Sequence, residues 1–364
     1  MQRLALFLAI TLVPILSVAQ SSTTTPKFAV GGCEPKLTSF NTISQAVSTV
    51  PPSSTILVCP GNYPEQVVIT QPLTLQGVLI GGSGAAVITV PSGGLSTSVS
   101  PGSGGSVSAF LAVENTGPVN INDIAVDGSG GSTGGCNVVG MYYLSSSGTI
   151  NHVAVRNVIS GGFCGDAIWA ENDNSTSSST VTVQNSTLNG FDGVGANVLS
   201  GPGAVNSVIN IQSNSIAGTS RTDGAGIVIF QAVGGTVSGN TVDNVSTGIV
   251  LQGTPSTAKS NRVSNTNGAV VVASAGNTVQ SNTIFNSSGI AVQVLANTNQ
   301  IVSNSFFSVG TGIGLFCNLA TSGNIVTGNT VNNAGTGIQN NGITGNTVAP
   351  NSYFNTTTAV GPCI

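Results

Sequence analysis

Three aspartates in the middle of the chain precede the same kind of short segment, a small residue followed by apolar residues at alternate positions. These aspartates are Asp166, Asp192 and Asp223. Later repeats carry Thr or Ser at the same position, namely Thr247, Ser288, Thr311 and Thr336. Carboxylates stacked at the ~4.8 Å spacing of adjacent strands would raise one another's pKa or recruit a cation such as calcium. The sequence therefore predicts acid/base chemistry here, with Arg221 as the charge-stabilising group.

Turn formation is the competing explanation for two of these aspartates. Asp192-Gly193 and Asp223-Gly224 are common turn dipeptides, and so is Asp127-Gly128. A turn is the favoured interpretation for both, because Asp-Gly needs no catalytic role. Asp166 is not followed by Gly, so it is the strongest single candidate for an acid/base residue or a cation ligand.

Aromatic residues lie beside Asp166 in the same repeats. Strand alternation predicts Tyr142 and Trp169 at matching outward positions of consecutive repeats, with Glu171 on the same strand. Two adjacent outward rings would form a platform for a sugar ring. The column continues with Val228, Val250, Val271 and Ala291. An apolar stripe of this kind could equally be covered by the loop 91–108 or by a partner chain, so packing is slightly favoured over ligand binding.

These residues are embedded in a repeat that begins with Asn. The leading Asn falls at positions 157, 185, 214, 240, 261, 282, 304, 329 and 346. The spacings between these residues therefore run from 17 to 29 residues. Inexact periods of this length, with Gly, Thr, Val, Ser and Asn in every unit, indicate a β-solenoid rather than helical repeats. We predict an all-β, right-handed parallel β-helix of about ten or eleven coils, in which each Asn side chain bonds to the amide one coil away.

The beginning of the solenoid resembles a known superfamily. In the segment 40–77, Phe40, Ile43, Val47 and Val50 have helical spacing, Thr42 and Gln45 can form a capping box, and "PGNYPE" follows the first strand. This segment is similar to the start of pectinesterases and to other right-handed parallel β-helix proteins of the pectate-lyase-like (pectin lyase fold) superfamily, in which a short helix caps the core. The resemblance implies acidic polysaccharides as ligands and a site of carboxylates, Arg or Lys, or calcium on one outer sheet.

The active-site motifs of the enzyme families in that superfamily are not matched. Polygalacturonase-like enzymes carry N-T-D, D-D, G-H-G and R-I-K, whereas this chain has "RTDG" at 221–224 and its single histidine, His152, in "NHVAV". The resemblance therefore predicts the fold more strongly than the activity.

Composition indicates an exported protein. Residues 1–19 have the charge, the apolar run and the small-residue end of a signal peptide. The apolar run is shorter than a membrane span, so we expect no membrane span in the mature chain. Residues 20–364 are expected to form a single domain. Charged residues make up only 5% of the chain, with no basic stripe for nucleic acid. Six cysteines allow 15 pairings. The favoured pairs are Cys33–Cys59, Cys136–Cys164 and Cys317–Cys363, because each joins neighbouring segments or ties down an end.

The sequence thus predicts a secreted, periplasmic or cell-surface protein that binds an acidic polysaccharide. If it is an enzyme, the resemblance implies a polysaccharide lyase or glycoside hydrolase. No cofactor other than calcium is expected. The alternative is a non-catalytic, adhesin-like rod that assembles through its outward apolar column. A third hypothesis comes from similar coils in periplasmic copper-delivery proteins, and the absence of paired His and Met argues against it.

Overall fold

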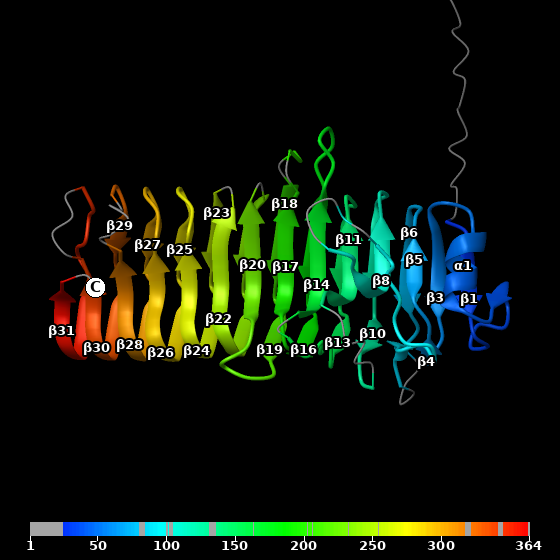
Figure 1. Cartoon of the computed structure of the whole chain (residues 1–364), viewed down its shortest axis with the longest axis horizontal. Coiled ribbons are helices and arrows are strands. Elements are labelled where there is room, and N and C mark those ends of the chain that lie inside the picture. The colour runs from blue at the N-terminus through cyan, green and yellow to red at the C-terminus, as the bar shows by residue number, and fades with distance from the viewer. Residues whose placement is uncertain are drawn as a thin grey trace, which may run out of the picture.

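The chain forms an elongated right-handed parallel β-helix, shown by a computed structural model (Figure 1). The structure describes residues 25–79, 84–99, 101, 105–130, 136–162, 164–201, 203–205, 207–231, 233–253, 255–316, 322–340 and 345–362. The predicted signal peptide and the predicted Cys317–Cys363 bond lie outside these residues. Within them there is no helix long and apolar enough to cross a membrane.

One face of the helix is a sheet of short parallel strands. In spatial order they are β2 (Ser39–Phe40), β1 (Lys27–Val30), β3 (Ser54–Val58), β6 (Leu73–Gly77), β9 (Val119–Asn122), β12 (Gly148–Asn151), β15 (Thr180–Gln184), β18 (Ser207–Gln212), β21 (Val233–Ser238), β23 (Ser256–Lys259), β25 (Thr278–Gln280), β27 (Gln300–Val302) and β29 (Ile325–Thr327).

The other two faces begin as separate rows of strands. One row contains β4 (Gly61–Pro64), β7 (Ala86–Thr89), β10 (Ile124–Asp127), β13 (Ala154–Arg156), β16 (Thr187–Phe191) and β19 (Ser215–Gly218). The second row contains β5 (Val67–Ile69), β8 (Ser108–Glu114), β11 (Val138–Leu144), β14 (Gly165–Asn172), β17 (Val194–Ser200) and β20 (Ala225–Gln231).

Toward the C-terminus the two rows merge. Strand β22 pairs with both β19 and β20, so one long strand now covers both faces of a coil. The long strands are β22 (Thr241–Gly253), β24 (Arg262–Val272), β26 (Thr283–Val294), β28 (Ser305–Leu315), β30 (Thr330–Gln339) and β31 (Ser352–Gly361). The C-terminal coils are therefore more regular than the middle coils, where loops separate the strands.

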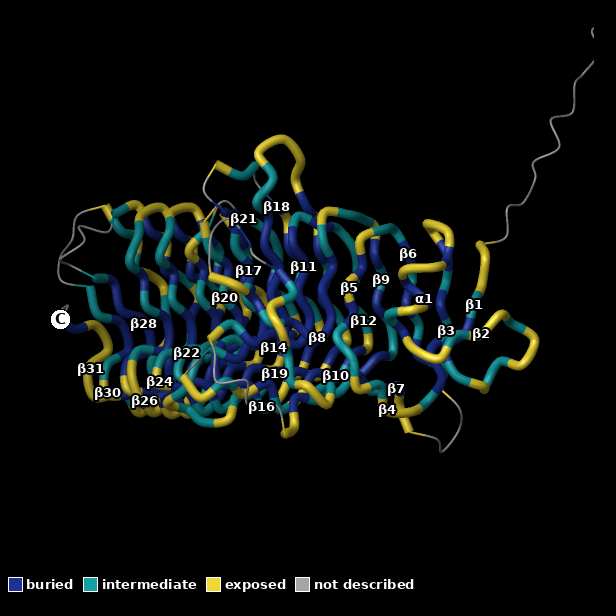
Figure 2. Tube along the Cα trace, turned by 45° about the vertical axis from the view of Figure 1, so that its right-hand side comes forward, coloured by how far each residue is buried: buried dark blue, intermediate teal, exposed yellow. Residues whose placement is uncertain are grey.

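Aliphatic side chains stack along the inside of the helix. Figure 2 shows buried residues along the trace in successive coils. A representative row is Ile227, Ile249, Val270, Val292, Ile313 and Ile338, in which every side chain is fully buried. Burial of each such side chain contributes about 1.5–3 kcal/mol relative to exposure. Strand alternation turns Val228, Val250 and Val271, which follow the first three members of the row, to the outer face, where each is half-buried.

Buried asparagines form the predicted ladder along one corner. The side-chain N–H of Asn240 donates to Oδ1 of Asn261 at 3.0 Å, and that of Asn261 donates to Oδ1 of Asn282 at 2.9 Å. The ladder extends through Asn214, Asn304, Asn329 and Asn351. Each amide also satisfies backbone groups at the turn, so these buried polar side chains are fully bonded.

Three of the predicted ladder positions are wrong. Asn157 and Asn185 adopt left-handed backbone conformations at corners, with φ of 58° and 52°, and Asn185 is exposed. Ser186 occupies the ladder position instead and its N–H donates to Asn214 Oδ1. Asn346 belongs to a second row of asparagines that includes Asn324. Neighbouring Asn residues at one corner have different roles, and the repeat pattern alone does not separate them.

The N-terminal end is closed by helix α1 (Ile43–Thr49), as predicted. Thr42 Oγ1 accepts a hydrogen bond from the N–H of Gln45 at 3.1 Å. The carboxylate of Glu65 accepts hydrogen bonds from the N–H groups of Ile43 and Ser44 at 2.9 and 2.8 Å. The Glu of the "PGNYPE" turn thus ties the first turn of the capping helix to the solenoid.

Candidate functional site

The candidate site lies on the outward face of β8, β11 and β14, in the middle coils. Register pairs Tyr142 with Trp169 and Leu144 with Glu171. Met141 and Tyr143, which alternate with these residues on β11, are buried in the main core. The structure therefore places Tyr142 and Trp169 on adjacent coils and outside the main core, as strand alternation predicts.

These two rings are packed rather than exposed as a platform. Tyr142 is 0% exposed and Trp169 is 7% exposed, and the rings meet edge to face with centroids 5.5 Å apart. Val99 and Val107, which bridge to each other in the loop 91–108, pack over them. Val99 and Val107 thus cover the aromatic pair, in agreement with the packing interpretation that the sequence slightly favours, because two large outward rings are more stable when shielded from water.

Beneath this cover lies a buried carboxyl group. Glu171 is 2% exposed, and its Oε2 accepts a hydrogen bond from the phenol of Tyr142 at 2.9 Å. Among the described residues, Oε1 of Glu171 receives no hydrogen bond from an N–H or hydroxyl donor. Burial, followed by hydrogen bonding and charge from Asp173, raises the pKa of Glu171 to about 8, although the Tyr142 hydrogen bond opposes this shift.

Two further acids border Glu171. Glu114 lies two coils from Glu171 on the same column, since Leu144 pairs with both residues. Burial also raises the pKa of Glu114. Burial, followed by the charge and hydrogen bond of Glu171 and the charges of Asp173 and Glu114, raises the pKa of the Tyr142 phenol, which remains a hydrogen-bond donor. Glu114 and Asp173 are half-buried, so the cluster meets solvent at their edge of the face.

The indole of Trp169 adds an unpaired donor to the cluster. Its Nε1 atom is buried and has no acceptor in the described part of the chain. Buried polar atoms are nearly always paired in folded proteins, so an indole donor without an acceptor, on the same strand as the buried Glu171 carboxyl, is a candidate for binding a ligand.

Asp166 is buried and bonded within the fold. Its Oδ1 accepts the N–H of Val194 at 2.7 Å, and its Oδ2 accepts the side-chain amide of Asn197 at 2.8 Å. Burial raises its pKa to about 6, with a smaller contribution in the same direction from the charge of Asp192, while the two hydrogen bonds lower it. Both of its oxygens are used to connect β14 to β17.

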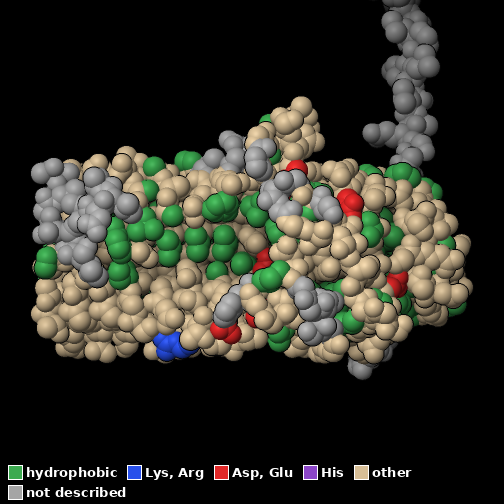
Figure 3. Space-filling model, in the orientation of Figure 1, with side chains coloured by type: hydrophobic (Ala, Val, Ile, Leu, Met, Phe, Trp, Pro, Cys, Tyr) green, Lys and Arg blue, Asp and Glu red, His purple; other side chains and the backbone are tan. Residues whose placement is uncertain are grey.

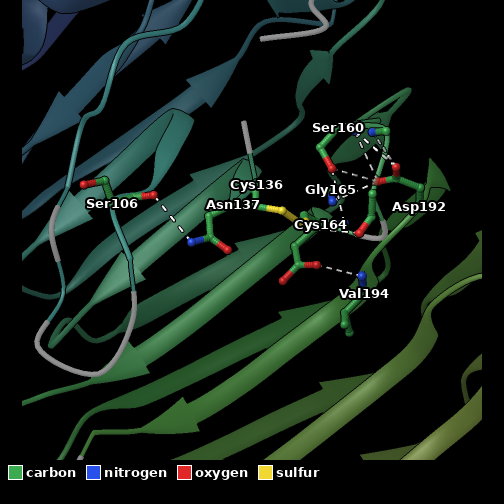
Figure 4. The surroundings of a disulfide bond; sticks show 11 residues. Ser106, Cys136, Asn137, Ser160, Cys164, Gly165, Asp192 and Val194 are labelled. Carbon is green, nitrogen blue, oxygen red and sulfur yellow. Dashed lines mark hydrogen bonds between the residues drawn. A yellow bond between two sulfur atoms is a disulfide. The ribbon is translucent and has the colours of Figure 1, made fainter. Parts of the chain in front are cut away.

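Asp192 holds a turn. Its carboxylate accepts the backbone N–H groups of Gly161 and Gly165 at 2.8 Å each and that of Ser160 at 3.2 Å. Figure 4 shows Asp192 with Ser160 and Gly165 near the Cys136–Cys164 disulfide. A carboxylate that accepts several backbone N–H groups is an anchor for the loop 157–165, which agrees with the turn interpretation.

Asp223 and Arg221 do not complete a catalytic set around Asp166. Asp192 and Asp223 line a small cavity of about 160 Å³ together with Gly161 and Gly162. The Asp223 carboxylate is bonded by Thr219 and Thr222 of its own loop. The guanidinium of Arg221 donates to the carbonyl of Thr266 at 3.0 Å, two coils further on. The structure thus brings two of the four predicted residues into one cavity.

The sequence pointed to Glu171 for a different role and missed Glu114. Glu114 is the last residue of β8 and Glu171 is the last but one of β14, and the column that they share could be recognised only from strand register. In contrast, the Cys33–Cys59 and Cys136–Cys164 disulfides confirm the predicted pairings.

The metal donors of the described residues do not fit a copper site. Met141 is fully buried in the core, and His152 bonds through Nδ1 to Asp123. The four described cysteines are oxidised to disulfides. No group of three or more His, Cys, Asp or Glu residues is arranged to hold a metal ion in the described ranges. Copper sites use soft thiolate or thioether sulfur and imidazole, which are not gathered here.

Comparison with solved structures supports the fold. The chain is similar to the lacto-N-biosidase of family GH136 from Eubacterium ramulus, with 13% identity and a TM-score of 0.60 over 90% of this chain and 68% of that one. It is similar to the DFA-IIIase from Arthrobacter chlorophenolicus A6 without its lid, with 14% identity and a TM-score of 0.57 over 92% and 100% of the two chains. A mutant of the periplasmic alginate epimerase AlgG gives 12% identity and a TM-score of 0.53 over 86% and 83%.

Family comparison is more specific than these similarities of shape. No curated protein matches the chain. A family model described as "Periplasmic copper-binding protein (NosD)" matches residues 172–361, just over half of the chain. The periplasmic family and the two disulfides place the protein outside the cytoplasm. The chain belongs to the NosD family of right-handed parallel β-helix proteins.

Proposed function

We propose that this protein acts on an extracellular polysaccharide by acid/base chemistry at Glu171 and Asp173. The observation that carries the proposal is the Glu171 carboxyl group, which is buried, held by Tyr142 and raised in pKa to about 8. Such a carboxyl keeps its proton at neutral pH, as a general acid must. Pairs of carboxyl groups with different environments are typical of glycan-cleaving sites.

The chemistry requires one proton to leave Glu171 and one to return. In hydrolysis, Glu171 would protonate the departing glycosidic oxygen as its bond to the sugar carbon breaks, and water would supply the new bond to that carbon. Asp173 would accept the proton released by the water and return it to Glu171 across the hydrogen bond between the two carboxyl groups. Tyr142 orients the Glu171 carboxyl, and the Trp169 N–H, which lacks an acceptor in the described residues, would bind a sugar hydroxyl. The glycan would enter at the edge bordered by Glu114 and Asp173.

The choice of a polysaccharide as the substrate class is supported by resemblance to other proteins and not by the chemistry of the Glu171 site. The first residues resemble polysaccharide-acting β-helix proteins, and the solved structures similar in fold include a lacto-N-biosidase and a periplasmic alginate epimerase. At these identities the likeness concerns the fold.

Copper binding, which the family description names, is not part of this proposal. The described cysteines form disulfides, Met141 lies in the core, and His152 is alone with Asp123. These donors supply none of the paired soft ligands that copper prefers, so no step is assigned to the metal.

The test is product analysis by mass spectrometry after incubation with pectins, alginate and neutral plant glycans. The wild-type protein should release new oligosaccharides from at least one glycan, and Glu171→Gln should release none. Asp223→Asn is the matched control, because that carboxylate is bonded within an exposed loop, and it should remain active. Products that persist in Glu171→Gln would overturn the assignment of the acid.

A non-catalytic binding rod is the second candidate function, and one observation favours it. The column that begins with Tyr142 and Trp169 continues, after Asn197, as half-exposed Val228, Val250 and Val271. In Figure 3 hydrophobic side chains form rows over this half of the face. A rod would bind a glycan or a second copy without turnover, so an unchanged glycan panel for the wild-type protein would support it.

A further inference from the structure

A second surface with binding chemistry lies on the C-terminal coils, on the first halves of β24, β26 and β28. An open groove of about 600 Å³ is lined there by Arg262, Thr283, Phe285, Asn286, Phe307 and Ser308. It is separate from Glu171, which lies on β14, four coils earlier along the rod. The repeats in this region otherwise carry small polar residues, so the aromatic and cationic side chains depart from the pattern.

Strand alternation explains why two phenylalanines face outward here. Ile284 and Phe306 are fully buried in the core, and their neighbours Phe285 and Phe307 therefore point to solvent. Register pairs Phe285 with Phe307 on adjacent coils, at the ~4.8 Å spacing of parallel strands. Phe307 is 40% exposed. Exposed aromatic rings in successive coils are costly unless they have a partner.

Arg262 gives the groove its charge. Its guanidinium carbon lies 3.9 Å from the centre of the Phe285 ring, a cation–π contact that holds the guanidinium over the aromatic face. Arg262 is exposed and forms no ion pair with any described residue. A guanidinium presented in this way keeps its N–H donors free for a carboxylate.

The charge balance of this half favours an anionic ligand. From residue 231 to the end, the charged side chains are Lys259, Arg262 and Asp243, whereas the whole chain has a net charge of −4. The Asp243 carboxylate is already bonded to the hydroxyl of Ser264 and to the amide of Asn265. The groove is therefore the place on the C-terminal half where a cation is available next to aromatic rings.

Amide side chains form a row that meets the groove at Asn286. Asn286 donates to Asn265, and Asn333 donates to the hydroxyl of Ser308 at 3.1 Å. A sugar ring has an apolar C–H face and hydroxyl groups at its edge, and a uronic acid adds a carboxylate. Two aromatic rings, a guanidinium and a row of amides match these three features. We propose that this groove binds a uronic-acid polysaccharide, independently of turnover at Glu171.

The test is isothermal titration calorimetry with oligogalacturonates as the acidic probe and malto-oligosaccharides as the neutral probe. Glu171→Gln is the parent protein, so that binding is measured without cleavage at the middle coils. Phe307→Ala should weaken oligogalacturonate binding about tenfold or more, and Arg262→Gln should remove most of the preference for the acidic over the neutral probe. Phe354→Ala is the control, because Phe354 is 55% exposed in the same column two coils further on, and it should change affinity less than twofold.

Several results would overturn the proposal. Oligogalacturonate affinity that is unchanged in both Phe307→Ala and Arg262→Gln would exclude the groove as the binding site. Equal affinity for the acidic and neutral probes would exclude the role of Arg262. A dimer that dissociates in Phe307→Ala, seen by analytical ultracentrifugation, would make the groove a contact between copies of the chain. A wild-type protein that cleaves no glycan would refute the proposed function and leave this binding result unaffected.

Discussion

The phenol of Tyr142 donates its hydrogen bond to Oε2 of Glu171 at 2.9 Å, from β11 to the next coil at β14. Both side chains are buried, so the bond is shielded from water. It holds the carboxyl in one orientation and opposes the rise in its pKa caused by burial and Asp173. The proton affinity of Glu171 therefore depends on a side chain from the neighbouring coil.

Tyr142→Phe should raise the pKa of Glu171 above its wild-type value. The substitution removes the hydrogen bond that lowers this pKa, while burial and Asp173 remain. Loss of the bond should also lower the free energy of unfolding by about 1–2 kcal/mol. The carboxyl titration by NMR and urea denaturation measure the two effects. Tyr143→Phe is the matched control, because that phenol donates to the Val119 carbonyl, and it should leave the Glu171 titration unchanged.

Stability should fall as pH rises toward 8. The folded state keeps the Glu171 proton until a pKa of about 8, whereas the unfolded chain loses it near the ordinary pKa of 4.5. The contribution of this group is thus fully present below about pH 4.5 and is lost as pH rises to 8. The pKa of Asp166 is raised from 3.8 to about 6, so this group adds a further loss of folding stability as pH rises from about 4 to 6.

Urea denaturation of Glu171→Gln between pH 6 and 8 isolates the first of these contributions. The variant has no carboxyl to titrate at this position, so its free energy of unfolding should vary less with pH than that of the wild-type protein. An equally steep decline in both proteins would show that Glu171 does not cause it.

Asp192→Ala should destabilise the fold by about 2–4 kcal/mol. The change leaves the backbone N–H groups of Ser160, Gly161 and Gly165 without their acceptor. Asp223→Ala, on an exposed loop, should change stability by about 0.5 kcal/mol or less. Thermal or urea unfolding compares the two. If Asp192→Ala unfolds like the wild-type protein, the carboxylate does not anchor the loop 157–165.

Asn282→Ala should lower the free energy of unfolding by about 3 kcal/mol or more. The buried Asn282 amide bonds to Asn304 and to the Ala258 carbonyl, and its Oδ1 accepts from Asn261. Alanine leaves these buried partners unsatisfied. Asn267→Ala, at an exposed position, is the control and should be nearly neutral. A neutral Asn282→Ala in urea denaturation would mean that the ladder contributes little to stability.

The fold could be predicted because its signals are local and repeated. The period, the short alternating strands and the capping-box residues Thr42 and Gln45 each follow from chemistry within one or two coils. The two described disulfides, Cys33–Cys59 and Cys136–Cys164, were predictable because each joins neighbouring coils.

The site could be predicted only in part, because it depends on register and on cover by a loop. Strand alternation placed Tyr142 beside Trp169, yet their burial depends on Val99 and Val107 in the loop 91–108. The three aspartates share a sequence context and have different bonding partners. Arg262 and Phe285 lie in coils whose sequences carry few charged residues and no recognised motif. Their contact exists only because one coil stacks on the next.

The titration of the Glu171 carboxyl by carbon-13 NMR, assigned with Glu171→Gln, tests the central claim most directly. A proton donor at this position requires that the group remain protonated at neutral pH, and the structure predicts a midpoint of about 8. A midpoint near the ordinary 4.5 would mean that Glu171 is ionised at neutral pH, and it would contradict the proposed acid/base role.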